Sequence, residues 1–211
     1  MITVWGRATS SNVQMVVWAL AEIGLPFERH DVGGAFGGTD TPEYGRMNPN
    51  RLVPTFQDGD LILWESAAIV RYLGARYATE AFWPSDPARR APLDMWAEWI
   101  KTSFGPAFLT GVFWQLLQKA ETRDLKALDA SVKRVSTLVL MLEERLADGP
   151  YLGGKDICFA DIIVGTLLYR YFTLDFDRPA TPNLEAYYKR LTERPAYGEH
   201  VMVSYDSLRA K

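Results

Sequence analysis

Three short groups in the first third of the chain carry residue types that could bind a small ligand. Thr-Ser-Ser-Asn at 9–12 precedes a run with helical periodicity, and Glu65-Ser66 begins a second such run. The first turn of a helix exposes unpaired N–H groups at the positive end of the helix dipole, where a carboxylate or thiolate is stabilised. The hydroxyls could donate to that anion, and Glu65 could receive an ammonium group. Simple helix capping would use the same residues.

The third group is Val53-Pro54 at the start of a predicted strand. Proline has no N–H for a sheet ladder, so it belongs at a strand start or a sheet edge. A cis bond would leave the backbone N–H and C=O of Val53 free to pair with an extended ligand. Taken alone, the dipeptide favours the trans form, because only about 5–6% of X–Pro bonds are cis.

Other kinds of site are excluded by residues that the sequence lacks. The single cysteine, Cys158, cannot form an intrachain disulfide or a CxxC pair, and the two histidines are far apart. We therefore expect no metal site. The glycine-rich run at 33–38 matches neither GxGxxG nor a P-loop, and we interpret it as a flexible loop. The first lysine is Lys101, so a lysine-dependent site cannot lie before it.

The size and charge of the chain limit its class. With 211 residues, 48% of them hydrophobic and 23% charged, it is typical of a soluble globular protein with one large domain or two small ones. A net charge of −3 argues against a nucleic-acid binder. The apolar run at 15–21 is far shorter than the ~20 residues of a membrane span. We see no signal-peptide pattern and expect a cytoplasmic protein.

Strand and helix patterns alternate as far as residue 78. The predicted strands cover 2–5, 27–32, 53–57 and 61–64, and the predicted helices cover 13–23, 41–47 and 65–77. Gly24 ends the first helix, and Asp58-Gly59 marks a hairpin. The strand–helix–strand order favours parallel pairing, to which the hairpin adds an antiparallel edge.

Only helical periodicity remains after the proline-rich segment at 83–87. The predicted helices cover 94–118 with a kink at Pro106, 125–146, a buried stretch at 159–172, and a last one starting at Pro182. The fold class is therefore α/β plus all-α. We predict an N-terminal domain at 1–78, a linker at 79–87 and an all-helical domain at 88–211.

In this order, the residues resemble the cytosolic glutathione transferase family in its serine-type, bacterial-like form. The strongest stretch is 48–73, NPNRLVPTFQDGDLILWESAAIVRYL, which is similar to the family's cis-proline strand, hairpin and glutamate-serine helix start. The resemblance implies a thioredoxin-like N-terminal domain followed by a C-terminal helical bundle, and it favours a cis bond at Pro54.

A second marker of the family is ICFADIIVG at 157–165. The family usually has Ser or Thr at the position of Cys158, so we expect an incomplete capping box here. Asp161 can still reach back to the backbone, and Ile157 with Ile162 can form a hydrophobic staple.

The resemblance also implies a glutathione site. The backbone of Val53 would pair with the cysteinyl unit, and Glu65 and Ser66 would hold the γ-glutamyl end. Many relatives have Gln or Lys at the position of Leu52, so the glycyl carboxylate would be held elsewhere. Arg51 and Arg46 are candidates, because a guanidinium fork suits a carboxylate.

The resemblance also implies a catalytic position, which is counted from Gly24. Counting back fourteen residues reaches Ser10, the spacing of serine-type members. Ser11 ranks second, and Asn12 ranks third or as a helper. The serine hydroxyl would donate a hydrogen bond to the glutathione thiolate, assisted by the helix N-terminus.

The implied activity is transfer of glutathione, as co-substrate, to a hydrophobic electrophile bound between the two domains, as in detoxification. The candidate lining residues are the aromatics Phe36, Phe104, Phe108 and Tyr169. We expect a homodimer with no nucleic-acid or membrane partner. The alternatives are a non-catalytic glutathione-binding or interaction module, and a glutathione-dependent peroxidase or isomerase.

Overall fold

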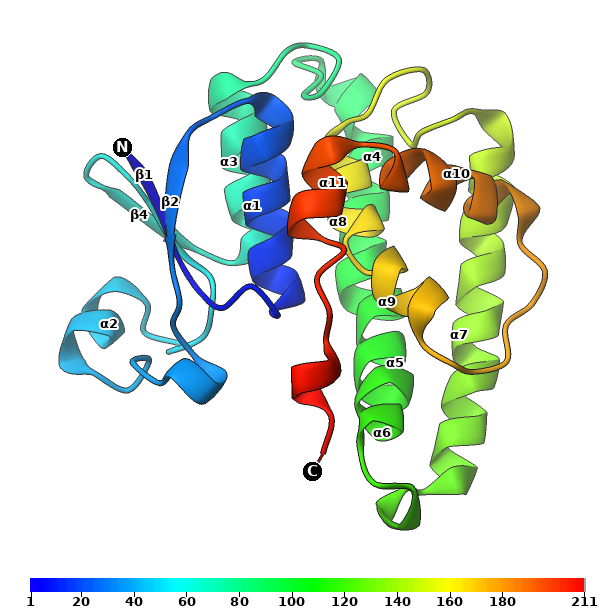
Figure 1. Cartoon of the computed structure of the whole chain (residues 1–211). Coiled ribbons are helices and arrows are strands. Elements are labelled where there is room, and N and C mark those ends of the chain that lie inside the picture. Colours follow the sequence, from blue (N-terminus) through cyan, green and yellow to red (C-terminus); the bar gives the residue numbers. More distant parts are fainter. Residues whose placement is uncertain (211) are drawn as a thin grey trace.

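A four-stranded mixed sheet forms the core of the N-terminal part of the chain (Figure 1). The computed structural model describes residues 1–210. The strands are β1 (Ile2–Trp5), β2 (Phe27–His30), β3 (Thr55–Asp58) and β4 (Leu61–Trp64). They lie in the order β2-β1-β3-β4, with β1 parallel to β2 and antiparallel to β3, and with β3 antiparallel to β4. This arrangement agrees with the predicted parallel unit and hairpin.

Three helices accompany this sheet: α1 (Ser11–Ile23), α2 (Pro42–Met47) and α3 (Ser66–Tyr77). The apolar faces of α1 and α3 are fully buried, including Val16 of α1 and Leu73 of α3. Gly24 has φ 81° and ends α1 in the left-handed conformation, as predicted. The glycine-rich loop holds a short 3₁₀ turn, Gly34–Phe36, where the sequence predicted only a loop.

The rest of the chain is helical. With the mixed sheet and its helices before it, the fold is thioredoxin-like in its N-terminal part and helical in its C-terminal part. Residues 78–86 contain no helix or strand; the linker at 79–87 stays a prediction. The larger helices are α4 (Pro87–Trp99), α7 (Leu125–Arg145) and α10 (Pro182–Thr192), and the shorter ones are α5 (Gly105–Phe108), α6 (Trp114–Leu117), α8 (Phe159–Gly165), α9 (Leu168–Thr173) and α11 (Pro195–His200). No helix within residues 1–210 is long and apolar enough to cross a membrane.

The region predicted as one helix at 94–118 begins earlier and is interrupted twice. It starts at Pro87, where Asp86 caps the backbone, and it contains π-helical segments at Ile100–Phe104 and Leu109–Phe113. Pro106 lies between these segments and has no backbone N–H to donate to an α-helical hydrogen bond. The wider π-helical turns beside it pair backbone groups at a different spacing. Each inserted residue turns the side chains that follow by about 100° around the axis.

The buried stretch predicted at 159–172 is two helices, α8 and α9. The hydroxyl of Thr166 donates to the carbonyl of Ile162 at 2.7 Å, which is a side-chain bond that competes with the helical ladder. The break between α8 and α9 consists of Thr166 itself and Leu167.

The capping box at the start of α8 is complete, so the expectation that Cys158 would leave it incomplete is wrong. The sulfur of Cys158 faces the backbone N–H of Asp161, and the Asp161 carboxylate accepts from the N–H of Cys158 at 2.8 Å. A thiol is a weak acceptor, but it can stand where a hydroxyl usually does. The same carboxylate accepts from the Leu152 N–H and the Tyr187 hydroxyl, at 2.8 and 2.9 Å.

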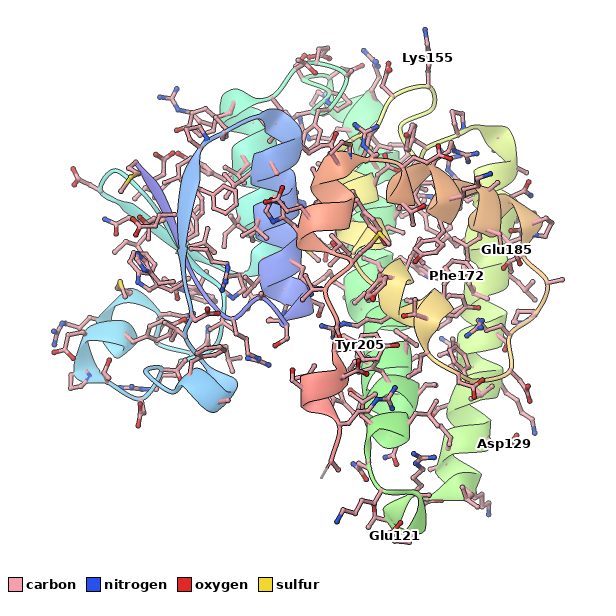
Figure 2. All side chains as sticks on the ribbon, in the orientation of Figure 1. Glu121, Asp129, Lys155, Phe172, Glu185 and Tyr205 are labelled. Carbon is pink, nitrogen blue, oxygen red and sulfur yellow. The ribbon has the colours of Figure 1, made fainter. Side chains whose placement is uncertain are left out.

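Contacts between α1 and the helical part hold the two parts together. Arg194, just before α11, forms an ion pair with Glu22 of α1, and Trp18 donates to the same carboxylate at 3.1 Å. Near the C-terminus, Tyr205 packs against the helices (Figure 2), with its ring 5.2 Å from that of Phe113.

Candidate functional site

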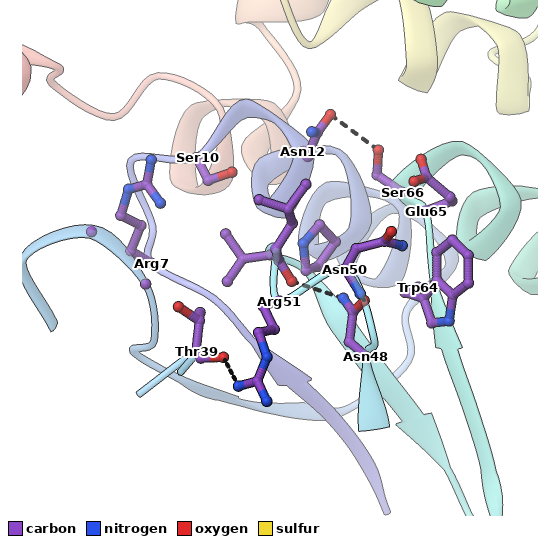
Figure 3. A pocket seen from close by; sticks show the side chains of 15 residues that line it. Arg7, Ser10, Asn12, Thr39, Asn48, Asn50, Arg51, Trp64, Glu65 and Ser66 are labelled. Carbon is purple, nitrogen blue, oxygen red and sulfur yellow. Dashed lines mark hydrogen bonds between the residues drawn. The ribbon is translucent and has the colours of Figure 1, made fainter. Parts of the chain in front are cut away.

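A cavity of about 330 Å³, here called the first cavity, opens where the ends of α1 and α3 approach the loop before β3 (Figure 3). The Val53–Pro54 peptide bond in that loop is cis, as the resemblance predicted. The cavity is lined by Arg7, Ser10, Asn12, Gly33, Gly34, Thr39, Asn48, Asn50, Arg51, Leu52, Val53, Pro54, Trp64, Glu65 and Ser66.

Ser10 caps α1 with its backbone and leaves its hydroxyl available. Its φ and ψ of −86° and 122° are those of a helix cap, and its side chain makes no capping hydrogen bond. The Ser10 N–H donates to the carbonyl of Arg7 at 3.1 Å, which tightens the preceding turn. Ser11 is 9% exposed and does not line this cavity. Of the three catalytic candidates, Ser10 and Asn12 therefore face the first cavity.

The start of α3 presents Glu65 and Ser66 to the cavity. Glu65 has φ 71°, a conformation that costs a non-glycine residue energy and is often found at functional sites. The amide of Ile69 is the first to donate within this helix, to the carbonyl of Glu65, so the preceding amides remain available to an anion. The Ser66 hydroxyl donates to Asn12 Oδ1 at 3.1 Å.

The loop that carries Val53 is held by a buried polar group. Asn48 Nδ2 and the Tyr44 hydroxyl both donate to the carbonyl of Leu52 at 2.8 Å, and the Thr55 hydroxyl donates to Tyr44 at 2.9 Å. Burial raises the pKa of Tyr44, so its hydroxyl stays protonated as a donor. The side chain of Leu52 is 67% exposed, and its carbonyl is the part that the loop uses.

Two arginines line the first cavity, and the sequence indicated only one. Arg51 donates to the carbonyls of Thr39 and Thr41 at 3.1 and 3.0 Å, so this part of its guanidinium is occupied by the loop. Arg7 was missed. It lies across the cavity from Glu65 in Figure 3, and its place three residues before Ser10 was the available signal. Arg46 is exposed, pairs with Glu43 and lies outside the cavity.

A second cavity, of about 210 Å³, lies against the helical part of the chain. Apolar side chains form most of its wall. Its lining residues are Ser11, Asn12, Met15, Ile100, Lys101, Gly105, Pro106, Leu109, Thr110, Ile163 and Leu167. Among residues 1–210, Asn12 alone lines both cavities.

The four aromatics predicted for the substrate pocket line neither cavity. Phe104 and Phe108 are fully buried and pack against Tyr171, so neither is exposed to a ligand in these cavities. Their following neighbours, Gly105 and Leu109, line the second cavity instead.

Phe36 and Tyr169 lie away from the two cavities for different reasons. Phe36 is 60% exposed on its 3₁₀ turn and lies outside both cavities. Tyr169 packs its ring 6.1 Å from that of Tyr205, which lies near the C-terminus. Neither position was readable from local sequence, because both depend on how distant segments fold back.

Lys101 is the second functional candidate that the sequence missed. Its Nζ lies 3.0 Å from Asn12 Oδ1 and 3.4 Å from Ser66 Oγ. Burial lowers the pKa of Lys101, and the nearby carboxylates of Glu65 and Glu98 oppose that change. The helical part of the chain thus places a cation against the N-terminal ends of α1 and α3.

The described residues, 1–210, contain no cluster of three or more His, Cys, Asp or Glu side chains placed to hold a metal ion. The site as built offers hydroxyls, amides, backbone groups at two helix ends and cations of both parts. Such a set can bind a molecule that carries carboxylates and an ammonium group, and can hydrogen-bond an anion at Ser10.

Comparison with known proteins gives one consistent family. Residues 1–75 match the family model for the glutathione S-transferase N-terminal domain, and residues 94–195 match the C-terminal domain. The chain is 39% identical to glutathione S-transferase GstB of Escherichia coli over 206 residues, 96% of this chain and 99% of the relative. It is 29% identical to glutathione S-transferase 3 of Zea mays over 208 residues, 95% and 93% of the two chains.

A solved structure is similar over almost the whole length. It is the theta class glutathione S-transferase of Xanthomonas axonopodis pv. citri with glutathione bound, which is 44% identical and superposes with a TM-score of 0.90. The match covers 96% of this chain and 98% of that one.

Proposed function

Because the chain belongs to the glutathione S-transferase family and is a glutathione transferase, we propose that it binds glutathione in the first cavity and activates the thiol at Ser10. The observation that carries this proposal is the position of Ser10. Its uncommitted hydroxyl lies at the start of α1, in the same cavity as Val53 and the start of α3.

The cavity offers a partner for each part of the tripeptide. The γ-glutamyl ammonium would meet the carboxylate of Glu65, and its carboxylate would meet the free amides at the start of α3. The backbone of Val53 would pair with the cysteinyl unit. The glycyl carboxylate would bind Arg7 or Arg51, which both line the cavity.

The hydroxyl of Ser10 and the start of α1 would together supply a free energy of the size that forming a thiolate at neutral pH requires. A free thiol has a pKa of about 8.5, and lowering it by about two units needs roughly 2.7 kcal/mol. One hydrogen bond to a charged group contributes about 1.5–3 kcal/mol, and a helix N-terminus about 0.3–1 kcal/mol. The thiol proton would pass to solvent, and the thiolate would attack an electrophilic carbon with its lone pair. The sulfur–carbon bond would form as the bond from that carbon to its leaving group breaks, and the leaving group would depart with that electron pair.

The second cavity is our proposed electrophile site. Its apolar wall includes Met15, Ile163 and Leu167, which suits a hydrophobic molecule. Asn12 lines both cavities, so a glutathione sulfur beside Asn12 would be within reach of an electrophile in the second cavity.

We also propose a cytoplasmic homodimer with a role in detoxification. Exposed apolar side chains lie on β4, where Leu61, Ile62 and Trp64 are 40%, 38% and 39% exposed, and on α4, where Met95 is 61% exposed. Such a surface favours association with a second protein surface. We expect no nucleic-acid partner, since the net charge is −3.

Conjugation of glutathione to a panel of electrophiles tests the function. Ser10→Ala is expected to lower kcat/KM at neutral pH about 10- to 100-fold, which corresponds to one charge-assisted hydrogen bond. Ser131→Ala is the control for loss of a serine hydroxyl, because Ser131 lies on α7 and lines neither cavity.

Three outcomes would contradict parts of this proposal. Full activity of Ser10→Ala together with loss in Asn12→Ala would move the catalytic role to Asn12. Retention on immobilised glutathione without turnover would favour a binding module. Reduction of peroxides without any conjugation would favour a peroxidase.

A further inference from the structure

Asn12 occupies the place where the two cavities meet. Among residues 1–210, it is the one residue that lines both. A sulfur held in the first cavity that attacks a molecule in the second must lie beside this side chain. The orientation of its amide therefore decides whether the sulfur meets an N–H donor or a carbonyl oxygen.

Two donors fix that orientation. Lys101 Nζ lies 3.0 Å from Asn12 Oδ1, and the Ser66 hydroxyl donates to the same oxygen at 3.1 Å. An ammonium group donates hydrogen bonds and accepts none, so the atom of Asn12 that faces it must be the oxygen. The nitrogen then points the other way, and Figure 3 shows it on the side of Asn12 that faces Ser10.

We propose that Lys101 is a positioning residue that holds Asn12 by its oxygen, so that the amide N–H of Asn12 and the hydroxyl of Ser10 donate together to the glutathione sulfur. The inference rests on the proposed function, because it takes the first cavity as the glutathione site. Lys101 belongs to the π-helical segment Ile100–Phe104, so the helical part of the chain completes the surroundings of the sulfur.

The charges near the site agree with this role. Burial disfavours the ammonium form of Lys101, and the carboxylates of Glu65 and Glu98 favour it. The Coulomb attraction to Glu65 also holds the lysine near the start of α3. The charged side chains at or beside the two cavities are Arg7, Arg51, Glu65, Glu98, Lys101 and Arg170.

The test measures the pKa of the bound thiol, from the ultraviolet absorbance of the thiolate across a pH series. Lys101→Met and Asn12→Ala are each expected to raise this pKa by about one unit, a tenfold loss of thiolate. The double variant is expected to show no further rise, and Lys101→Arg, which keeps a donor, is expected to restore most of the effect.

Asn12→Asp provides a second route that does not depend on how Lys101→Met folds. It keeps the shape of the side chain but replaces the donor with a carboxylate oxygen. We expect it to raise the thiol pKa at least as much as Asn12→Ala does. Lys133→Met, on the exposed face of α7, is the control for loss of a lysine and is expected to leave the pKa unchanged.

Two results would overturn the inference. If Lys101→Met still raises the thiol pKa in the Asn12→Ala background, Lys101 acts through its own charge rather than through Asn12. If Lys101→Met weakens the binding of S-methylglutathione, which has no thiol, Lys101 binds the peptide instead. Failure of the proposed function is distinguishable, because the wild-type protein itself would then not bind glutathione.

Discussion

Replacing Arg170 should separate the stability of the fold from the alignment of Ser10. Arg170 lies in α9, is 3% exposed, and donates from Nη2 to the carbonyl of Thr9 at 2.7 Å. Its guanidinium also stacks 4.8 Å from the ring centre of Phe113. The neighbouring carbonyl of Ala8 is held by Gln14, so this tie helps to fix the turn before α1.

The energetic terms at Arg170 nearly cancel. Burial, with a contribution from Arg7, lowers the pKa of Arg170 to about 10. A fall of this size corresponds to a cost of about 3 kcal/mol for the buried charge. The hydrogen bond returns about 1.5–3 kcal/mol and the aromatic contact about 0.5–2 kcal/mol. Arg170→Met should therefore change the free energy of unfolding by no more than about 2 kcal/mol.

The same substitution should impair catalysis. Without the tie to Thr9, the turn that precedes Ser10 is free to move, and small displacements at a reacting centre are costly. We expect kcat/KM for conjugation to fall about tenfold, with stability measured in parallel by urea denaturation.

Arg178→Met is the matched control for Arg170→Met. Arg178 also donates to backbone carbonyls, those of Tyr171 and Leu174, and stacks 4.9 Å from Phe176. It has no hydrogen bond to the turn before Ser10, so kcat/KM should stay at the wild-type value. Unchanged activity in Arg170→Met, or a loss of stability well above about 2 kcal/mol, would refute the reasoning.

Two further predictions concern stability. Asp161→Asn keeps the volume of the side chain but replaces one accepting oxygen with an N–H donor, which then faces another donor such as the Cys158 N–H. The free energy of unfolding should therefore fall by about 3 kcal/mol. A fall of less than about 1 kcal/mol would contradict the assigned hydrogen bonds. At Asp58, hydrogen bonds from Tyr77 and Tyr72 hold the pKa below its ordinary 3.8. That stabilisation is complete above the unfolded-state pKa and is lost as the pH falls through the lower folded-state value. Asp58→Asn should thus be about 1 kcal/mol less stable than wild type near neutral pH, with the difference vanishing in acid; a difference that persists there would contradict the linkage.

Local patterns were sufficient where a residue's own backbone preference decides the structure. The hairpin at Asp58-Gly59 and the end of α1 at Gly24 were predicted correctly, because each follows from turn or capping chemistry within a few residues. The same holds for the placement of Ser10 and Ser66 at the starts of helices.

The lining of the second cavity could not be predicted this way, because part of it comes from a helical region that is not regular. The sequence offered Phe104 and Phe108 as candidates because they are aromatic, whereas both are buried and Gly105 and Leu109 line the second cavity. The sequence also did not indicate the contact of Lys101 with Asn12. No spacing in the sequence indicates that contact, since the two residues lie 89 positions apart.

The most direct test of the account is a crystal structure with glutathione bound. We expect the γ-glutamyl end at Glu65 and Ser66, and the sulfur within hydrogen-bond distance of both Ser10 Oγ and Asn12 Nδ2, at the junction of the two cavities. A sulfur that points away from Ser10, or that lies beside the carbonyl oxygen of Asn12, would contradict the central claim.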